Sequence, residues 1–255
     1  VVSRISTPRE TAALEMRESD ELDPQGVTFI PAATPPSTEV VVPGVPAHGE
    51  RTLRILAPGD TDAIVAVRLL GPDGPFSPVG QDVITVAAGT VAELPIGEAA
   101  GEAATAVSLD SDVPVTASVR VVDTLEDKAP DLAYTAATAP LAGPTPALLG
   151  VSNKSLATSL LVTAVGELPA RVHVRSVLTD GSVAEEQTVD VPGRSTVVVP
   201  VTAAPDSSWT TVIVDPAEPG TVAVTREIVG SDDAGALVDL LPLVSPVLTV
   251  RVPEV

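Results

Sequence analysis

Short stretches of alternating hydrophobic and polar residues run through this chain from about residue 26 onward. In residues 63–70, Val65, Val67 and Leu69 point to one face of an extended strand, while Arg68 is among those on the other. Pro, Gly and Asp separate these stretches, and valine and alanine are their main hydrophobic residues. This pattern predicts an all-β protein whose antiparallel sheets have one buried and one solvent-facing side.

The same pattern occurs twice in the chain. Residues 63–74 (AIVAVRLLGPDG) return as residues 170–181 (ARVHVRSVLTDG), each ending in an Asp-Gly pair suited to a tight hairpin. Three shorter segments return in the same order: 32–36 as 136–140, 93–96 as 198–201, and 116–120 as 223–226. Repetition in a fixed order, at about the length of a small domain, indicates a duplicated unit.

We therefore expect two tandem antiparallel β-sandwich repeats of the immunoglobulin-like (Ig-like) kind. The first repeat is expected over residues 26–127 and the second over 128–255, with a charged linker at their boundary. The alternative is a single pseudo-symmetric unit, in which closing strands at 236–241 and 247–252 pair back with the first repeat.

Residues 1–25 are expected to form a leader with a short helix over 9–20, which is rich in helix-forming residues. In the first repeat, strands are expected near 26–31, 39–42, 51–56, 63–70, 81–86, 90–96, 104–109 and 113–122. In the second, they are expected near 131–136, 147–151, 157–165, 170–178, 184–191, 195–201, 209–214 and 221–229.

Composition narrows the range of partners. A net charge of −20 repels nucleic acid and anionic lipid, so neither is expected as a partner. The chain has no cysteine, which excludes disulfides and thiolate chemistry. It also lacks an apolar stretch long enough to span a membrane, so we expect membrane attachment only through an anchor outside this segment. Because the sequence begins at Val1, we interpret it as a fragment, and a missing signal peptide does not argue against export.

Catalytic chemistry has few candidates. The two histidines are His48, in a turn, and His173, on the solvent-facing side of a strand. Neither has a second ligand at metal spacing, and there is no Gly-x-Ser-x-Gly motif, so we interpret both as ordinary surface histidines and predict no catalytic residue.

Two sites could bind a ligand. Asp110 and Asp112, on either side of Ser111 in an expected turn, could share a calcium ion, although acidic turns are common in β proteins. No other cofactor is expected. Trp209 is the one candidate platform for stacking a sugar ring, and its alternative role is to close the end of the second sandwich.

Three segments carry a resemblance to a known family: 57–63 (APGDTDA), 67–74 (VRLLGPDG) and 111–117 (SDVPVTA). They resemble an actinobacterial exported family of unknown function, whose members have a hydrophobic N-terminal anchor followed by a Val/Ala/Pro-rich extracytoplasmic β region. The resemblance implies an extracytoplasmic location, with the full-length protein anchored to the membrane. It brings no catalytic residues.

The expected function is a non-enzymatic scaffold or adaptor of the cell envelope, whose partner is an envelope protein or a cell-wall glycan. The first alternative is a glycan- or peptidoglycan-binding module centred on Trp209. The second is an atypical hydrolase that uses His48 or His173 with an acidic partner, which requires one of them to be buried beside a carboxylate. The oligomeric state does not follow from the sequence.

Overall fold

The computed structural model describes residues 11–13, 28–125, 129–150, 156–202, 210–233 and 235–246. Nearly all of this part of the chain lies in antiparallel sheets, and its only helix is the short α1 (Gly97–Ala100). No helix among these residues is long and apolar enough to cross a membrane. The all-β prediction is therefore confirmed, while the Ig-like kind of sandwich remains a prediction.

The first sandwich is organised around one long strand, β9 (Thr105–Asp123). The first part of β9 lies between β3 and β5, and its second part lies between β4 and β10, so this strand belongs to two sheets. β6 and β7 pair with β5, and β8 pairs with β4. The other strands are β3 (Ser37–Val45), β4 (Glu50–Leu56), β5 (Ala63–Gly71), β6 (Gly74–Phe76), β7 (Val83–Val86), β8 (Val91–Pro95) and β10 (Asp131–Ala136).

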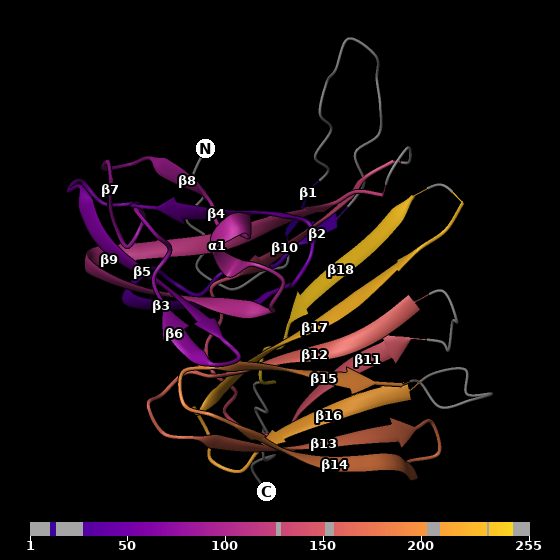
Figure 1. Ribbon diagram of the computed structural model, residues 1–255. Coiled ribbons are helices and arrows are strands. Elements are labelled where there is room, and N and C mark those ends of the chain that lie inside the picture. Colours follow the sequence, from indigo (N-terminus) through magenta and orange to yellow (C-terminus); the bar gives the residue numbers. More distant parts are fainter. Residues whose placement is uncertain are drawn as a thin grey trace, which may run out of the picture.

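The second sandwich repeats this arrangement (Figure 1). Its sheets have the orders β11-β16-β13-β14 and β15-β12-β17-β18, which match β3-β9-β5-β7 and β8-β4-β9-β10 of the first sandwich. The strands are β11 (Thr145–Gly150), β12 (Leu156–Ala164), β13 (Ala170–Leu178), β14 (Val183–Val191), β15 (Thr196–Val201), β16 (Thr210–Pro216), β17 (Val222–Ser231) and β18 (Ala236–Pro242). The duplication seen in the sequence is thus a duplication of topology.

Each sandwich buries the apolar face of its alternating strands. In β5, Val65, Val67 and Leu69 are fully buried, as the alternation predicts. β-branched side chains pack densely on a pleated sheet, which explains how a chain so poor in aromatic residues builds two cores.

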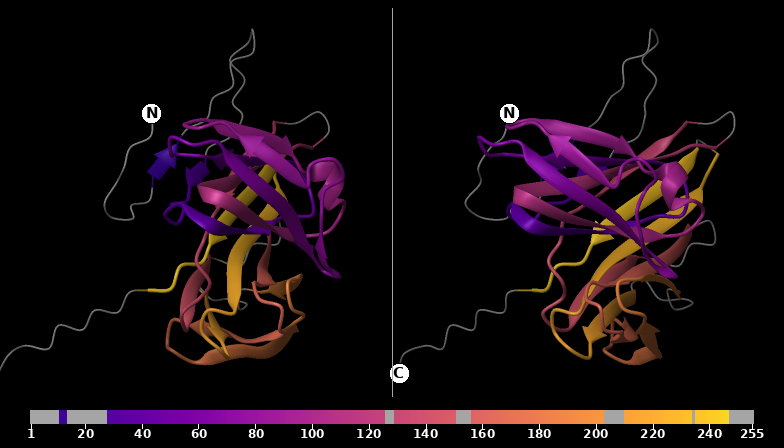
Figure 2. Two further views of the ribbon diagram at one scale, coloured as in Figure 1. Left: turned by 90° about the vertical axis from the view of Figure 1, so that its left-hand side faces the viewer. Right: turned by 60° about the vertical axis from the view of Figure 1, so that its left-hand side comes forward.

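The two sandwiches meet along β18. This strand pairs with β17 of the second sandwich, yet its Val238 and Leu240 are buried in the core of the first. Figures 1 and 2 show β17 and β18 reaching from the second sandwich along the flank of the first. The Asp131 carboxylate at the start of β10 accepts a hydrogen bond of 2.9 Å from the Val238 backbone N–H. The junction therefore combines a shared core with polar contacts between strands.

This junction differs from the pseudo-symmetric alternative in how β18 meets the first sandwich. Backbone bridging between the two halves is limited, among the described residues, to one isolated parallel bridge between Ala129 and Gly235. β18 otherwise contributes side chains to the first core, while its backbone pairs with β17 of the second sandwich. The other proposed closing strand, 247–252, lies outside the described residues.

Three local predictions are wrong. The predicted turn between strands 104–109 and 113–122 is continuous strand, because β9 pairs through Ser111 with β5. The predicted opening strand of the second repeat is β10, and its pairing with β9 places it in the first sandwich. The boundary expected at 127/128 therefore falls before the end of the first sandwich.

The predicted helix over 9–20 is also wrong where the structure describes it. Thr11–Ala13 form β1, which pairs with β2 (Thr28–Ile30). Pairing with a neighbouring strand overrides the local helix propensity of this segment. The rest of the predicted helix lies outside the described residues.

Candidate functional site

The connection between β3 and β4 brings His48 to the junction. Gly49 follows it with a φ of +76°, and a Cβ atom there would lie 2.7 Å from the Val122 carbonyl oxygen of β9. Only glycine allows the chain to turn this close to the neighbouring backbone. The tight turn holds the imidazole ring of His48 beside the end of β9 and facing β17.

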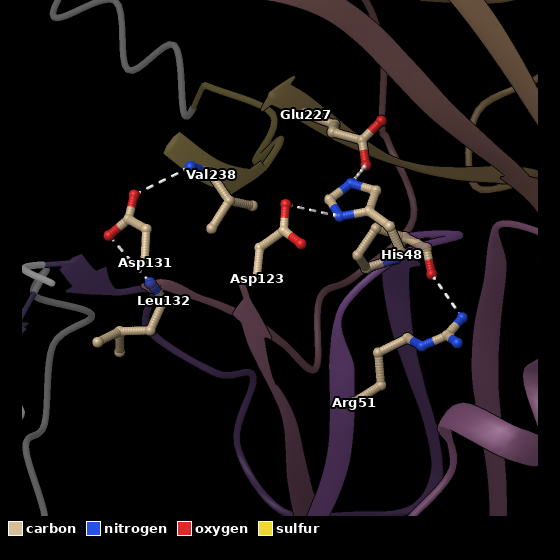
Figure 3. Close-up of polar contacts among 8 residues, drawn as sticks. His48, Arg51, Asp123, Asp131, Leu132, Glu227 and Val238 are labelled. Carbon is tan, nitrogen blue, oxygen red and sulfur yellow. Dashed lines mark hydrogen bonds and ion pairs between the residues drawn. The ribbon is translucent and has the colours of Figure 1, made fainter. Parts of the chain in front are cut away.

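The His48 ring lies between two carboxylates (Figure 3). Its Nδ1 is 3.2 Å from an oxygen of Asp123, which ends β9 in the first sandwich. Its Nε2 is 3.3 Å from an oxygen of Glu227, in β17 of the second sandwich. His48 therefore connects the two sandwiches by ion pairs when its ring is protonated.

These contacts lie in a partly buried part of the junction. Glu227 is only 8% exposed, and the side chain of His48 is 32% exposed. The Glu227 carboxylate contributes most to raising the pKa of His48 above its ordinary value, and Asp123 adds to the effect. Burial of the ring and the Arg51 guanidinium act in the opposite direction but do not cancel it.

Arg51 in β4 stabilises the turn that carries His48. Its guanidinium donates hydrogen bonds of 2.9–3.0 Å to the carbonyl oxygens of Pro46, Gly97 and Gly101. These bonds tie the turn that carries His48 to helix α1, and burial lowers the pKa of Arg51 from its ordinary value. Because all three acceptors are backbone carbonyls, Arg51 has a structural role here.

The geometry around His48 suits an ion pair better than catalysis. Both ring nitrogens face carboxylates, so neither is directed at a hydroxyl that it could activate. Asp123 and Glu227 lie at opposite nitrogens of the ring, and one metal ion cannot bind both nitrogens of one imidazole. Among the described residues, no group of three or more His, Asp or Glu side chains is arranged to hold a metal.

The structure corrects one prediction about the histidines. His48 lies in a turn as expected, but the interpretation that it is an ordinary surface histidine is wrong, because Asp123 and Glu227 meet it from distant parts of the sequence. His173 in β13 is on the solvent-facing side, as predicted, with its Nδ1 3.1 Å from the hydroxyl of Thr188. The hydrolase alternative required a buried histidine beside a carboxylate. His48 lies beside two carboxylates but its side chain is 32% exposed, and in the described part of the chain both of its ring nitrogens face these carboxylates.

The two predicted ligand sites have different outcomes. Asp110 and Asp112 lie within the continuous strand β9, and Asp112 uses one carboxylate oxygen to accept a hydrogen bond of 2.8 Å from the Ile64 N–H. Asp110 lies opposite Glu39 of β3. Calcium binding at this pair remains a prediction. Trp209 lies outside the described residues.

A cavity of about 480 Å³ opens between the two sandwiches. Its walls include Glu39 of β3 and Asp110 of β9 from the first sandwich, and Val165 and Arg194 from the second. The guanidinium of Arg194 is bound to Glu167 at 2.9 Å, and its backbone has a φ of +50°, which is unusual for a residue other than glycine. This cavity is a second feature of the junction that sequence patterns did not indicate.

Comparison with known proteins assigns the family. The chain belongs to a family of unknown function (DUF5719), whose model matches residues 5–202. No curated protein matches the chain. Actinobacterial origin and export are not part of that family description.

Solved structures give weaker likenesses. Thermotoga maritima 1070 is similar at 15% identity and a TM-score of 0.35, over 40% of this chain and 93% of its own. A calcium-binding mutant of Bacteroides uniformis β-glucuronidase 2 is similar at 11% identity and a TM-score of 0.21, over 80% of this chain. The match covers 25% of that enzyme. These likenesses are too weak to assign an activity.

Proposed function

We propose that this chain is a non-enzymatic scaffold or adaptor of the cell envelope, located outside the cytoplasmic membrane and anchored through a part of the protein beyond this segment. The observation that carries the proposal is the shared core. Val238 and Leu240 of the second sandwich complete the core of the first, so the two sandwiches are attached to each other along β18. Two attached domains that each present a surface are what a scaffold needs.

The chemistry of the junction also supports a role without catalysis. The histidine that sequence reasoning kept as a possible base has both nitrogens engaged by carboxylates. The net charge of −20 favours a neutral or basic partner over a polyanion. The cavity between the sandwiches, with Glu39 and Asp110 on one wall, offers such a partner a place to contact both sandwiches at once.

The experiment that tests this proposal is site-specific photo-crosslinking in cells that make the full-length protein. A photoreactive residue at position 39, in the cavity, is compared with one at 185, on the exposed outer strand β14. We expect one defined envelope protein to be crosslinked from position 39 and not from 185, and we expect external protease to reach the tagged domain in intact cells. Recovery of the domain in the cytoplasm, or equal crosslinking from both positions, would contradict the proposal.

Ligand and turnover measurements distinguish the alternatives. We expect cell-wall glycans and calcium to leave the thermal unfolding midpoint unchanged, since a ligand that binds only the native state raises that midpoint. A clear rise with a wall glycan would replace the scaffold with a glycan-binding module. Robust hydrolysis of any substrate in a panel, lost in His48→Gln, would replace it with the hydrolase.

A further inference from the structure

The number of protons on His48 decides how many of its contacts can form. A neutral imidazole carries one N–H and can donate to one acceptor, whereas an imidazolium carries two. Here Asp123 and Glu227 each offer an oxygen, at 3.2 and 3.3 Å from the two nitrogens. Both contacts are favourable together only when the ring holds two protons. Glu227 is 8% exposed, so without the proton on Nε2 its buried carboxylate faces an unprotonated nitrogen.

The two carboxylates belong to different sandwiches. Asp123 is the last residue of β9, and Glu227 lies within β17, the strand that pairs with the shared strand β18. We propose that His48 is a proton-operated latch between the two sandwiches: the protonated ring ties β9 to β17, and loss of one proton releases one tie and loosens this end of the junction. The latch requires only the two sandwiches, whatever partner they bind.

The other charged groups around the ring do not replace it. Arg51 of β4 is held by three backbone carbonyls, and Glu50 beside it is exposed. Asp131 of β10 is engaged with the backbone N–H groups of Val238 and Leu132, each at 2.9 Å. On β18, Asp239 is paired with Arg226. His48 lies between the carboxylates of Asp123 and Glu227 and contacts both of them.

The direction of the pH dependence follows from the sign of the shift. The folded protein raises the pKa of His48 above the ordinary value of 6.5, so folding favours the protonated ring. The stabilisation is complete below about pH 6.5, the ordinary value for an unfolded chain, and is lost as the pH rises through the raised pKa. The latch is therefore closed in mild acid and open in mild alkali.

The effect is confined to one end of the junction. Val238 and Leu240 hold β18 in the first core by apolar packing, and neither side chain titrates. The turn that carries His48, the end of β9 and the middle of β17 are the parts released. We expect a change of angle or local opening, with the two sandwiches still attached through β18.

Proton NMR tests the proposal on the intact chain. With only two histidines, His48 and His173 each give a resolvable ring signal, and His173 on the exposed face of β13 is the internal control. We expect the titration midpoint of His48 to lie above the ordinary histidine value of 6.5 and to fall in Glu227→Gln, whereas His173→Gln should leave it unchanged. A His48 midpoint at or below the ordinary value, or one that Glu227→Gln does not lower, would overturn the latch.

A second measurement follows the junction itself. The chain has no cysteine, so cysteines introduced at exposed positions 60 and 185 take one label in each sandwich. We expect the distance distribution between the labels to broaden between pH 6 and pH 8.5, and to be broad at both pH values in His48→Gln. His173→Gln should behave as the wild type. A distribution that is the same at both pH values in the wild type would overturn the proposal, even if His48→Gln failed to fold.

Discussion

The two sandwiches share one topology but complete their cores differently. The described core of the second sandwich contains only its own residues, from Leu141 to Leu243. The core of the first also contains Val238 and Leu240, which belong to the second. A duplicated unit has thus become asymmetric, because β18 of the second copy packs against β10 of the first. The first sandwich depends on its partner, and the second does not depend on the first to the same extent.

The strongest test of this asymmetry is Leu240→Ala. Leu240 is 3% exposed within the first core, so truncation leaves a cavity there and we expect a loss of about 2 to 5 kcal/mol of unfolding free energy. Hydrogen exchange should show the loss first in amides of β4 and β9, in the other sandwich. Leu241→Ala, on the opposite face of the same strand and 38% exposed, is the matched control and should change little. Faster exchange confined to the second sandwich would contradict a shared core.

The next test concerns how closely the sandwiches approach each other. Gly44 in β3 has a φ of +73°, and a Cβ atom there would collide with the side chain of Thr225 in β17. We expect Gly44→Ala to cost about 2 to 4 kcal/mol, from overpacking together with the left-handed backbone. Gly89→Ala is the control, because Gly89 has a similar φ of +70° but open space around it, and it should cost about 1 kcal/mol. Urea unfolding measures the free energy of unfolding of both variants. Equal losses would show that the contact between Gly44 and Thr225 does not limit the size of the side chain at position 44.

Much of this fold could be predicted from the sequence. Alternation in segments such as 63–70 identified strands, and the returning order of segments identified two copies of one unit. Where the sequence-based prediction was wrong, it rested on the composition of a short segment, whereas the structure of that segment is decided by its pairing with another strand. The segment 110–112 has the composition of a turn, yet pairing with β5 keeps it extended. The residues 11–13 favour a helix by propensity, yet they pair with β2.

The candidate site could not be predicted in the same way. His48 was correctly placed in a turn, but its partners Asp123 and Glu227 are far away in the sequence and carry no motif. Glu227 looks like a solvent-facing residue of an alternating strand, and it is buried only because the first sandwich covers that face of β17. Packing between domains decides such contacts, and periodicity along one strand contains no information about it.

A third test compares how much a buried polar contact contributes to stability in each sandwich, beginning with Arg51 in the first. Arg51 donates to three carbonyl oxygens, so Arg51→Met leaves those acceptors without their donor, and we expect a loss of about 2 to 3 kcal/mol. Arg51→Lys keeps the charge, but its single ammonium group lacks the planar fork of the guanidinium and cannot reach all three carbonyl oxygens. We expect its stability to lie between those of the wild type and Arg51→Met. Thermal unfolding followed by circular dichroism gives the order of the three proteins. Full stability in Arg51→Met would show that water replaces the guanidinium at no cost.

The smallest loss of stability is expected from a buried polar contact of the second sandwich. This contact is the hydrogen bond of 2.9 Å between the hydroxyls of Thr163 and Thr196. Both residues are almost completely buried, so Thr163→Val strands the Thr196 hydroxyl and should cost about 1 kcal/mol. The double change to valine removes both hydroxyls and should recover most of that loss, because two apolar groups of similar shape replace a satisfied pair. A double-mutant cycle in urea measures the coupling. If the double variant lost as much as the sum of the single ones, the coupling would be zero, and the contact between the two hydroxyls would contribute nothing of its own to stability.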